Sequence, residues 1–415
     1  MRHSTSIGTA AALALFSSAP CALAAVEILD YELSLLEIPG LAEPASTSRA
    51  VNGAGQIVGW YPAGGSATAN PLGFIATPDG SGGYTVARFP ASGGPTWVQP
   101  YDISDSGVIV GQGRTGSALT RIAFGNSNPS APLLGTPINE SETTGINSSG
   151  HMVGWRTLNN AVEAFYHDGN TASALAPFAQ GAVRESRALG INDQDQIAGY
   201  YVNNTGPSSD YRGFVYDRNT QALTELGLVT VQEPAAVTSW SQTYDAVSIN
   251  NTGQVAATQL TGENLSHAVL FNGGKVIDLG VVGDYEESFA AGISGTGWVV
   301  GFLTDADQVL GKSGFLWASG RMFDLSAPED YGLLPLPTGW EQITVVHDAY
   351  SVRDPNDPLG LTQIGTIVGE GIYLGQSRAF AMQITMQVPE PHTYLMLGFG
   401  LLAIGALRMR RVPVR

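Results

Sequence analysis

Apolar and polar positions alternate along much of the chain, and clusters of glycine, asparagine and aspartate interrupt the alternation. In the segment RGFVYD at 212–217, Phe214 and Tyr216 fall on one face of an extended chain, and SGFLWA at 313–318 follows the same pattern. A period of two is typical of β-strands. The pattern therefore predicts an all-β fold built from short strands and many turns.

One motif, VNGAGQIVGW at 51–60, recurs along the whole chain. Each copy has an apolar residue, a polar turn former, a turn glycine or its substitute, an apolar pair and usually a closing glycine. The other copies lie at 101–112, 144–155, 189–200, 247–258, 291–302 and, in degraded form, 361–370. The polar side chain can accept hydrogen bonds from backbone N–H groups two residues on, and glycine permits positive φ. The motif therefore predicts a hairpin turn between two strands.

Equivalent positions of the copies carry similar residues. The first strand contributes an apolar residue that we expect to be buried: Val51, Ile103, Ile146, Ile191, Ile249 and Ile293. The polar turn formers are Asn52, Ser104, Asn147, Asn192, Asn250 and Ser294. The closing glycines are Gly59, Gly111, Gly154, Gly199, Gly301 and Gly369. A glycine inside a strand suggests a bend or the close approach of another backbone segment.

Each repeat unit extends beyond this motif. A small residue followed by an aromatic one comes after a loop, in the pairs Gly73-Phe74, Ala123-Phe124, Ala164-Phe165, Gly213-Phe214, Gly314-Phe315 and Ala379-Phe380, with Ala268-Val269 as the exception. Another short strand follows, so a unit contains about four strands. The turn positions Gly55, Gly107, Gly150, Asp195, Gly253, Gly297 and Gly365 are 52, 43, 45, 58, 44 and 68 residues apart. The shorter spacings match a four-stranded propeller blade.

These units predict a seven-bladed β-propeller over residues 25–388. The seventh unit ends at 377–385 without a final strand, and a spare strand, YELSLLEIPG at 31–40, precedes the first unit. We therefore expect the N-terminal strand to complete the last blade. The alternative is an open stack of β-units, whose terminal edges would need caps.

The unit resembles the HAF repeat of bacterial extracellular proteins. The triplet after which that repeat is named is best kept at His267-Ala268-Val269, and other copies keep only the small residue and the phenylalanine. The resemblance covers most of residues 30–388. It implies a secreted β-repeat protein and supplies no catalytic residues.

The first 24 residues have the features of a signal peptide. Arg2 and His3 precede the apolar run 10–16, and Ala22-Leu23-Ala24 forms an A-x-A cleavage site, so the mature chain would start at Ala25 and signal peptidase would be a partner. The alternative is a lipoprotein anchored at Cys21, the single cysteine, although Pro20 directly precedes it. Cleavage at Ala24 would leave a chain without disulfides or thiolate metal sites.

The C-terminal tail at 389–415 has three parts. Pro389-Glu390-Pro391 comes first, an apolar run follows at about 393–407, and Arg408, Arg410 and Arg411 come next. This order resembles the PEP-CTERM sorting signal of exported proteins from Gram-negative bacteria. The resemblance implies a short membrane span, processing by an exosortase, and delivery to the cell surface or the extracellular matrix, often among exopolysaccharide. The alternative is an ordinary C-terminal anchor.

Charge excludes one class of partner. Without residues 1–24 and 389–415, the chain has 14 Lys and Arg against 35 Asp and Glu, a net charge of −21. Nucleic-acid binding normally needs a basic surface, so we expect no nucleic-acid partner.

No catalytic or metal-binding constellation is evident. His151, His167, His267 and His347 fall at different repeat positions, and no H-E-x-x-H or G-x-S-x-G motif occurs. Acidic residues at 192–196, 305–307 and 353–358 lack an EF-hand pattern, and solvated turn carboxylates explain them. We therefore expect no cofactor, no metal and no enzyme activity.

Four aromatic residues follow the closing glycines: Trp60, Trp155, Tyr200 and Phe302. Exposed at one rim of the ring, they would form a platform on which sugar rings stack. The alternative is that they pack between neighbouring blades.

The leading hypothesis is an exported, non-enzymatic surface or matrix protein that binds exopolysaccharide or a protein partner. The alternatives are a propeller-type carbohydrate-active enzyme, a glycosidase or lyase with two carboxylates in one pocket, and a structural matrix protein without a ligand. The insertion at 229–245 and the long stretch at 327–360 depart most from the repeat. The second includes Trp340, Glu341, His347, Asp348 and Arg353, and either could hold a specific site.

Overall fold

A computed structural model describes residues 26–40, 45–63, 70–89, 97–114, 122–125, 133–134, 140–159, 161–181, 183–203, 210–230, 247–262, 265–305 and 310–388. Val26–Val388 forms one compact unit. The predicted signal peptide, the sorting motif at Pro389, Glu390 and Pro391, the span at 393–407, and Arg408, Arg410 and Arg411 lie outside the described residues. Within the described part of the chain, no helix combines the length and the apolar character that crossing a membrane requires.

The strands fall into seven groups in chain order. The first three are β2 (Thr47–Val51), β3 (Ile57–Pro62), β4 (Pro71–Pro78) and β5 (Tyr84–Phe89); β6 (Trp97–Ile103), β7 (Ile109–Arg114) and β8 (Ile122–Phe124); and β9 (Ser141–Ile146), β10 (Met152–Leu158), β11 (Ala161–His167) and β12 (Ala172–Ala174). The next two are β13 (Glu185–Ile191), β14 (Gln196–Val202), β15 (Tyr211–Asp217) and β16 (Ala222–Leu228); and β17 (Val247–Ile249), β18 (Val255–Leu260), β19 (Ser266–Asn272) and β20 (Lys275–Asp278). The sixth is β21 (Glu287–Ile293), β22 (Val299–Thr304), β23 (Ser313–Ala318) and β24 (Arg321–Asp324), and the seventh is β25 (Trp340–Arg353), β26 (Thr362–Tyr373), β27 (Gln376–Gln387) and β1 (Glu27–Leu35).

Neighbouring strands within each group are antiparallel, as the alternating pattern and short turns require. One parallel bridge, between Val162 and Glu185, links the third and fourth groups into a single eight-stranded sheet. Among the described residues, two short 3₁₀ helices, η2 (Ala176–Gly181) and η3 (Pro328–Tyr331), lie between strands. The predicted all-β class is confirmed.

The N-terminal strand completes the last sheet, as predicted. β1 pairs antiparallel with β27, and the register runs from Glu27 opposite Gln387 to Leu35 opposite Phe380. The strand starts four residues and ends five residues earlier than the predicted segment at 31–40. The pairing joins the two ends of the described unit through backbone hydrogen bonds.

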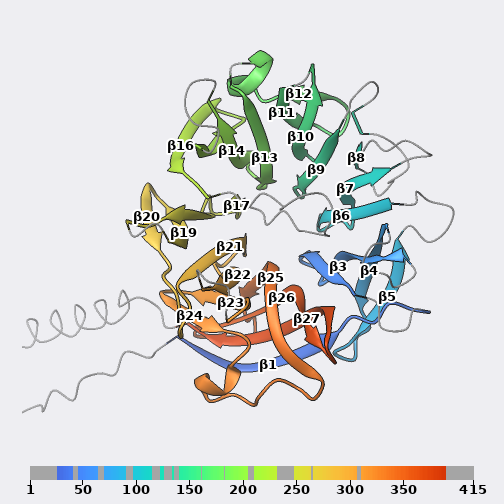
Figure 1. Cartoon of the computed structure of the whole chain (residues 1–415), viewed down its shortest axis with the longest axis vertical. Helices are drawn as coiled ribbons and strands as arrows, with labels where there is room; N and C mark the ends of the chain where they lie inside the picture. The colour runs from blue at the N-terminus through green and yellow to red at the C-terminus, as the bar shows by residue number, and fades with distance from the viewer. Residues whose placement is uncertain are drawn as a thin grey trace, which may run out of the picture. The chain divides into compact units, whose positions relative to one another are not determined.

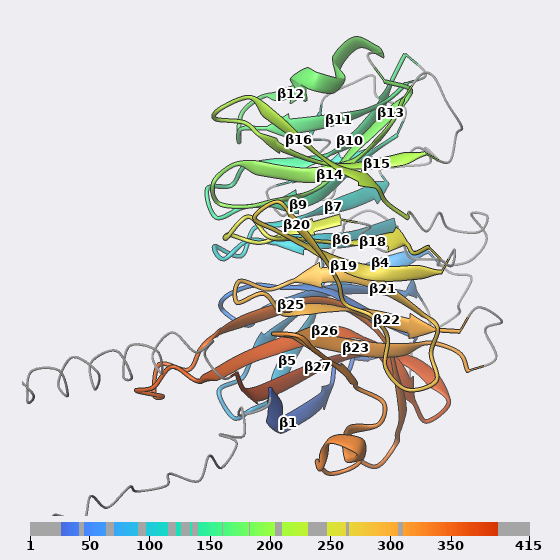
Figure 2. The ribbon, with the colours of Figure 1, turned by 90° about the vertical axis from the view of Figure 1, so that its left-hand side faces the viewer.

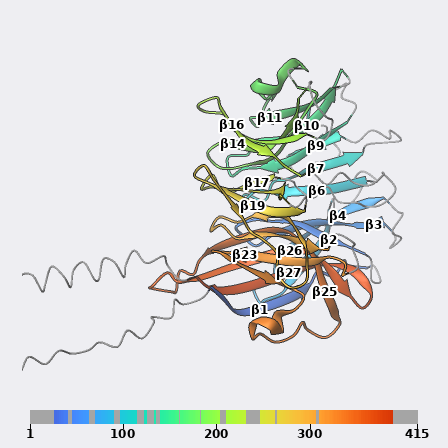
Figure 3. The ribbon, with the colours of Figure 1, turned by 60° about the vertical axis from the view of Figure 1, so that its left-hand side comes forward.

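Successive groups also pack against one another. The first strand of each group contacts strands of the preceding group, and β2 contacts β25, β26 and β27 in the same way. Figure 1 shows the groups following one another from β3–β5, past β9–β12 and β13–β16, to β21–β27. The side views in Figure 2 and Figure 3 show the strands of successive groups in layers.

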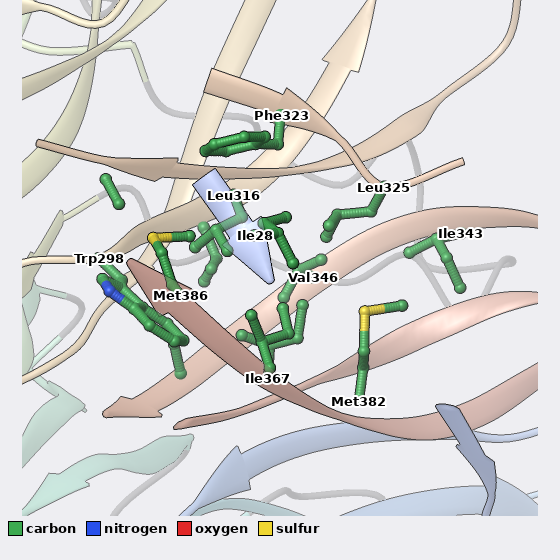
Figure 4. Packing of buried hydrophobic residues seen from close by; sticks show 14 of the residues in the cluster. Ile28, Trp298, Leu316, Phe323, Leu325, Ile343, Val346, Ile367, Met382 and Met386 are labelled. Atoms are coloured by element: carbon green, nitrogen blue, oxygen red, sulfur yellow. The ribbon is translucent and has the colours of Figure 1, made fainter. Parts of the chain in front are cut away.

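The largest hydrophobic cluster lies between the sixth and seventh groups. Figure 4 shows Trp298, Leu316 and Phe323 of the sixth group facing Ile367 and Met382 of the seventh. Ile28 from β1 lies in the same cluster, so the N-terminal strand contributes to this core as well as to the sheet. Removal of these side chains from water stabilises the pairing of the first and last strands.

The closing glycines lie where two backbones approach closely, as predicted. A Cβ added at Gly59, Gly111, Gly154, Gly199, Gly301 or Gly369 would overlap a carbonyl oxygen of the first strand in its group. In each case a register shift in the strand pairing lies next to the glycine. In the fifth group Ala257 takes this place and pairs with Val247 with no shift in the described register. The closing glycine therefore occurs only where the first strand of the described group carries a bulge.

The turn formers connect neighbouring groups. In Asn192, Oδ1 accepts hydrogen bonds from the N–H groups of Gln194 and Gln196, and Nδ2 donates to the carbonyl of Asn250 in the next group over 3.0 Å. The same amide-to-carbonyl bonds run from Asn52 to Ser104, from Asn147 to Asn192, and from Asn250 to Ser294, at 2.9–3.1 Å. The predicted turn capping is confirmed, and one amide both closes a turn and joins two groups.

The prediction for the seventh unit is wrong in two respects. Gly365 is not at a turn: it lies within β26, opposite Ser351, and the turn spans 354–361. The stretch at 327–360 is not a loop throughout, because it includes the 14-residue strand β25. β25 carries three register shifts against β26, and these bulges let two strands of 14 and 12 residues remain paired.

Candidate functional site

The four aromatic residues predicted to form an exposed rim are buried. The exposed fractions of Trp60, Trp155, Tyr200 and Phe302 are 5%, 7%, 2% and 0%. A platform for sugar stacking needs exposed ring faces, so that prediction is wrong. The alternative interpretation, packing between neighbouring groups, describes their surroundings.

Their contacts explain the burial. Trp60 packs edge-on against Tyr101 of the next group, with ring centroids 5.9 Å apart. Nε1 of Trp155 donates to Oε2 of Glu142 over 3.0 Å, and the guanidinium of Arg187, in the next group, lies 4.5 Å from the Trp155 ring. In both cases, the aromatic residue after the closing glycine packs against the first strand of the next group.

His347 and Arg49 join the last group to the first. Arg49 Nη1 and His347 Nδ1 lie 2.9 Å apart, and both side chains are buried. Asp348 Oδ2 accepts a hydrogen bond from the N–H of Val51 over 3.0 Å. Burial, and then the charges of Arg49 and Lys312, hold the pKa of His347 well below its ordinary value, so this histidine stays neutral. These contacts assign His347 and Asp348 a structural role.

The other residues singled out in the stretch at 327–360 are also tied to the fold. Trp340 packs against Tyr373 at 5.2 Å between ring centroids, and Oε1 of Glu341 accepts from the N–H of Gly375. Arg353 lies opposite Gln363 in the pairing of β25 and β26. Of the insertion at 229–245, only 229–230 are described.

The histidines do not come together. His151 Nδ1 lies 2.7 Å from Asp195 Oδ1, and His267 Nδ1 lies 3.0 Å from Asp278 Oδ1. Among the residues that the structure describes, no three His, Cys, Asp or Glu side chains are placed to hold one metal ion.

A groove of about 380 Å³ crosses the seventh sheet. Two rows of residues span its four strands: Tyr350, Thr366, Gln383 and Glu32 in one row, and Val352, Ile364, Thr385 and Asp30 in the other. Gly53 and Gly55, in the turn of the first repeat motif, also line it. The groove therefore lies where the last group meets the first.

The length of the seventh-group strands creates the groove. Strand alternation sends Met382, Ile384 and Met386 into the hydrophobic core, and it turns Gln383 and Thr385 to the opposite face. Farther along that face, Val368 and Ala381 pack against the first group. The ends of the long strands extend past this contact, and their polar side chains remain half-buried or exposed.

The groove is acidic and rich in neutral hydrogen-bonding groups. Asp30 and Glu32 are exposed on β1, and no Lys, Arg or His is among the described lining residues. Tyr84 of β5 lies close to Gln383 and Thr366 at the first-group side. Burial, with a smaller contribution from Glu32, raises the pKa of Tyr84, so its hydroxyl stays protonated.

The sequence alone does not reveal this groove. Its residues come from four segments, 30–32, 53–55, 350–366 and 383–385, and the repeat motif in two of them does not indicate that the four meet. The available signal was the pairing expected between the N-terminal strand and the last unit, which places Glu32 beside Gln383.

Comparison with known proteins identifies two regions. Residues 134–302 match the family model described as "Protein of unknown function (DUF3466)", a range that runs from before β9 of the third group into β22 of the sixth. Residues 387–411 match the PEP-CTERM protein-sorting motif, which starts where β27 ends. Among curated proteins, no match to the chain is found.

Solved structures include β-propeller neighbours. The β-propeller domain of the Trilobed protease from Pyrococcus furiosus is 7% identical, with a TM-score of 0.36 and 82% of each chain covered. TolB from Acinetobacter baumannii is 14% identical, with a TM-score of 0.36; 56% of this chain and 52% of that chain are covered. The α-L-arabinofuranosidase PaAbf62A from Podospora anserina is 8% identical, with a TM-score of 0.27 and coverage of 85% and 94%. At these TM-scores the neighbours do not indicate a function.

The sorting motif supplies the functional conclusion that the comparisons carry. Its match at 387–411 confirms the predicted PEP-CTERM signal. The resemblance of the repeats to the HAF unit stays a prediction. The chain carries a PEP-CTERM protein-sorting motif, which implies export to the cell envelope or surface.

Proposed function

We propose that the unit Val26–Val388 is a seven-bladed β-propeller that binds exopolysaccharide through the groove of its last blade, without catalysis. Signal peptidase and an exosortase would process the two ends, and the protein would act at the surface or in the matrix of a Gram-negative bacterium. The matched sorting motif supports exosortase processing.

The succession of contacts supports the propeller. Each of the seven groups has its first strand against the preceding group, and the seventh group contacts the first. β1 supplies the fourth strand of the seventh group, which fits a ring closed by pairing of the two chain ends. An open stack would leave the first and last groups without this contact.

The composition of the groove supports a carbohydrate ligand. Thr366, Thr385 and Gln383 offer hydroxyl and amide groups, Glu32 offers acceptor oxygens, and Tyr350 offers an aromatic ring. Sugars present many hydroxyl groups and apolar ring faces, so they need this mixture. Four strands at the usual spacing span about 14 Å, which gives an extended chain room to lie across the rows.

A pull-down with the host exopolysaccharide tests the proposal. The compact unit Val26–Val388 is compared with Thr366→Trp, which fills the groove, and with Thr224→Trp, which adds the same ring at an exposed position of β16. We expect the parent and Thr224→Trp to bind and Thr366→Trp to lose binding. Equal binding by all three would place the ligand elsewhere, and no binding would favour a structural or protein-binding role.

One observation favours a second candidate, a glycosidase. Asp30 and Glu32 are two residues apart on one strand and both line the groove, which places their Cα atoms about 7 Å apart. Glycoside hydrolysis uses paired carboxyl groups about 5–9.5 Å apart, and two side chains that start this close on one strand can reach that range. Both side chains are exposed, however, whereas a general acid is usually placed in a drier pocket. Release of reducing ends that both Asp30→Asn and Glu32→Gln abolish, with binding retained, would support this candidate.

A further inference from the structure

We infer that the groove takes a polysaccharide carrying free amino groups, such as a partly N-deacetylated hexosamine polymer. The inference rests on the proposed function, because it names the class of glycan for the same groove. It follows from the charge, the order and the accessibility of the lining residues.

The charge of the groove selects against acidic sugars. Asp30 and Glu32 are the charged side chains among the described lining residues, and both are anionic. The body of the protein, with a net charge of −21 without its two end segments, adds a field of the same sign. A polyuronate or a sulfated glycan would be repelled, whereas an ammonium group would be attracted.

The order of residues along the rows separates charge recognition from sugar recognition. Glu32 and Asp30 lie at the β1 end of the two rows, and Tyr350 and Val352 lie at the β25 end. Gln383 and Thr385 lie between them, on β27. A hexosamine chain laid across the strands would place amino groups beside the carboxylates of β1. Its hydroxyl groups would then lie over the side-chain amide of Gln383 and the side-chain hydroxyl of Thr385.

The carboxylates are accessible because β1 is the outer strand of its sheet. Both carboxylates are exposed, so an ammonium group can reach them without losing all of its hydration. Pairs in contact with water are weak singly and are screened by salt, so we expect modest effects that fall as ionic strength rises. The aromatic ring of Tyr350 provides an additional surface for a cation or a sugar face.

A peptide strand is a poorer fit to this groove. Extended peptides bind to sheets mainly through backbone hydrogen bonds at an open edge. The groove crosses the face of four strands, where the backbone groups between neighbouring strands are already bonded, and it does not run along the open edge of β1. Recognition in the groove therefore depends on side chains, and their polar groups can form hydrogen bonds with sugar hydroxyl groups.

Isothermal titration of the unit Val26–Val388 with a fully deacetylated glucosamine hexamer and with the N-acetylated hexamer tests the inference. We expect the deacetylated hexamer to bind about tenfold more tightly at low salt and to lose this advantage at high salt. Asp30→Asn and Glu32→Gln should each weaken it about threefold, and the double variant should bind both hexamers equally. Glu27→Gln, on the same strand outside the groove, is the matched control and should change nothing.

The outcomes separate the two proposals. Equal affinity of the parent for both hexamers would overturn the inference and leave the proposed function intact. No binding of any glycan, the host exopolysaccharide included, would overturn both. If poly-lysine binds as tightly as the deacetylated hexamer and through the same carboxylates, the groove recognises charge without sugar, and the inference is wrong. Thermal unfolding of each variant checks that these surface substitutions leave the fold unchanged.

Discussion

The side-chain amide of Asn192 donates a hydrogen bond to the backbone carbonyl of Asn250, 58 residues later in the chain, over 3.0 Å. The same side chain accepts two N–H groups of its own turn. Asn192 is therefore a link between the fourth and fifth groups as well as a turn former, and its removal would leave three polar backbone groups without this partner.

We predict that Asn192→Ala lowers the free energy of unfolding by about 2 kcal/mol, because buried polar groups lose hydrogen bonds. Chemical denaturation measures the change. Asn356→Ala is the matched control, since Asn356 is exposed in the turn of the seventh group, and it should change stability by less than about 0.5 kcal/mol. Equal effects of the two substitutions would show that the link between groups contributes nothing.

The closing glycines give a second prediction. Gly199→Ala places a Cβ on the carbonyl oxygen of Arg187, so the bulged strand must shift, at a cost of about 1–3 kcal/mol or more. The control is Gly262→Ala, because a Cβ at Gly262 meets nothing within 4 Å. Thermal unfolding of both variants measures the difference. A Gly199→Ala protein as stable as the parent would contradict the role assigned to these glycines.

Trp155 distinguishes packing from sugar binding. Because Trp155 is buried against Arg187 and bonded to Glu142, Trp155→Ala should cost about 3–5 kcal/mol of stability. Trp155→Phe, a milder change, should keep the fold and bind exopolysaccharide as the parent does. Loss of glycan binding in a folded Trp155→Phe protein would restore the idea of an aromatic platform.

The free energy of unfolding should decrease as the pH is lowered below about 6.5. The folded protein holds the pKa of His347 below its ordinary value of 6.5, so between those two values the unfolded chain binds a proton that the folded chain does not. This loss can reach about 1.4 kcal/mol per pH unit for His347. The pKa of His167 is also lowered, mainly by burial, and it acts in the same direction. Lowered pKa values of Asp79 and Asp357 add further loss only near pH 4 and below, since their ordinary value is 3.8.

Denaturation curves between pH 7.5 and 5 test this dependence. His347→Gln keeps a neutral polar side chain beside Arg49, and it should flatten the curve in that range. Asn356→Gln, in the exposed turn of the seventh group, changes no titrating group, and it should leave the slope as it is. A parent protein whose stability is constant from pH 7 to 5 would show that His347 is not held neutral by the fold.

Much of the architecture follows from local sequence patterns. The hairpin of each motif, the capping by Asn52 and its equivalents, the close approach at the closing glycines and the pairing of the N-terminal strand depend on residues that recur at fixed spacing. These features repeat in most units, so one sequence shows them several times.

Contacts between groups were harder to predict. Ser46, Ser141, Ser186 and Ser288 each accept a hydrogen bond from the N–H of the alanine that begins the small-residue–aromatic pair of the preceding group, or its variant Ala268-Val269. Each serine lies five residues before a buried residue of the first strand, for example Ser141 before Ile146. The serines were missed because their partners lie in another repeat. Burial of the aromatic after the closing glycine was undecided for the same reason.

The groove was the least predictable feature. It depends on the length of β25 and β26, which stay paired over more residues than the repeat pattern predicts. Three bulges interrupt this pairing. Its chemistry comes from rows that run across strands, as from Thr366 to Glu32, and no segment of the chain contains a whole row.

Hydrogen–deuterium exchange of Val26–Val388 with and without bound polysaccharide tests the central claim most directly, because it locates the ligand on the fold. We predict slower exchange in peptides from 27–35, 350–366 and 376–387, which carry the groove, with no change at β16 or β20. Slower exchange confined to other groups, with the seventh group unchanged, would contradict the assignment of the groove as the binding site.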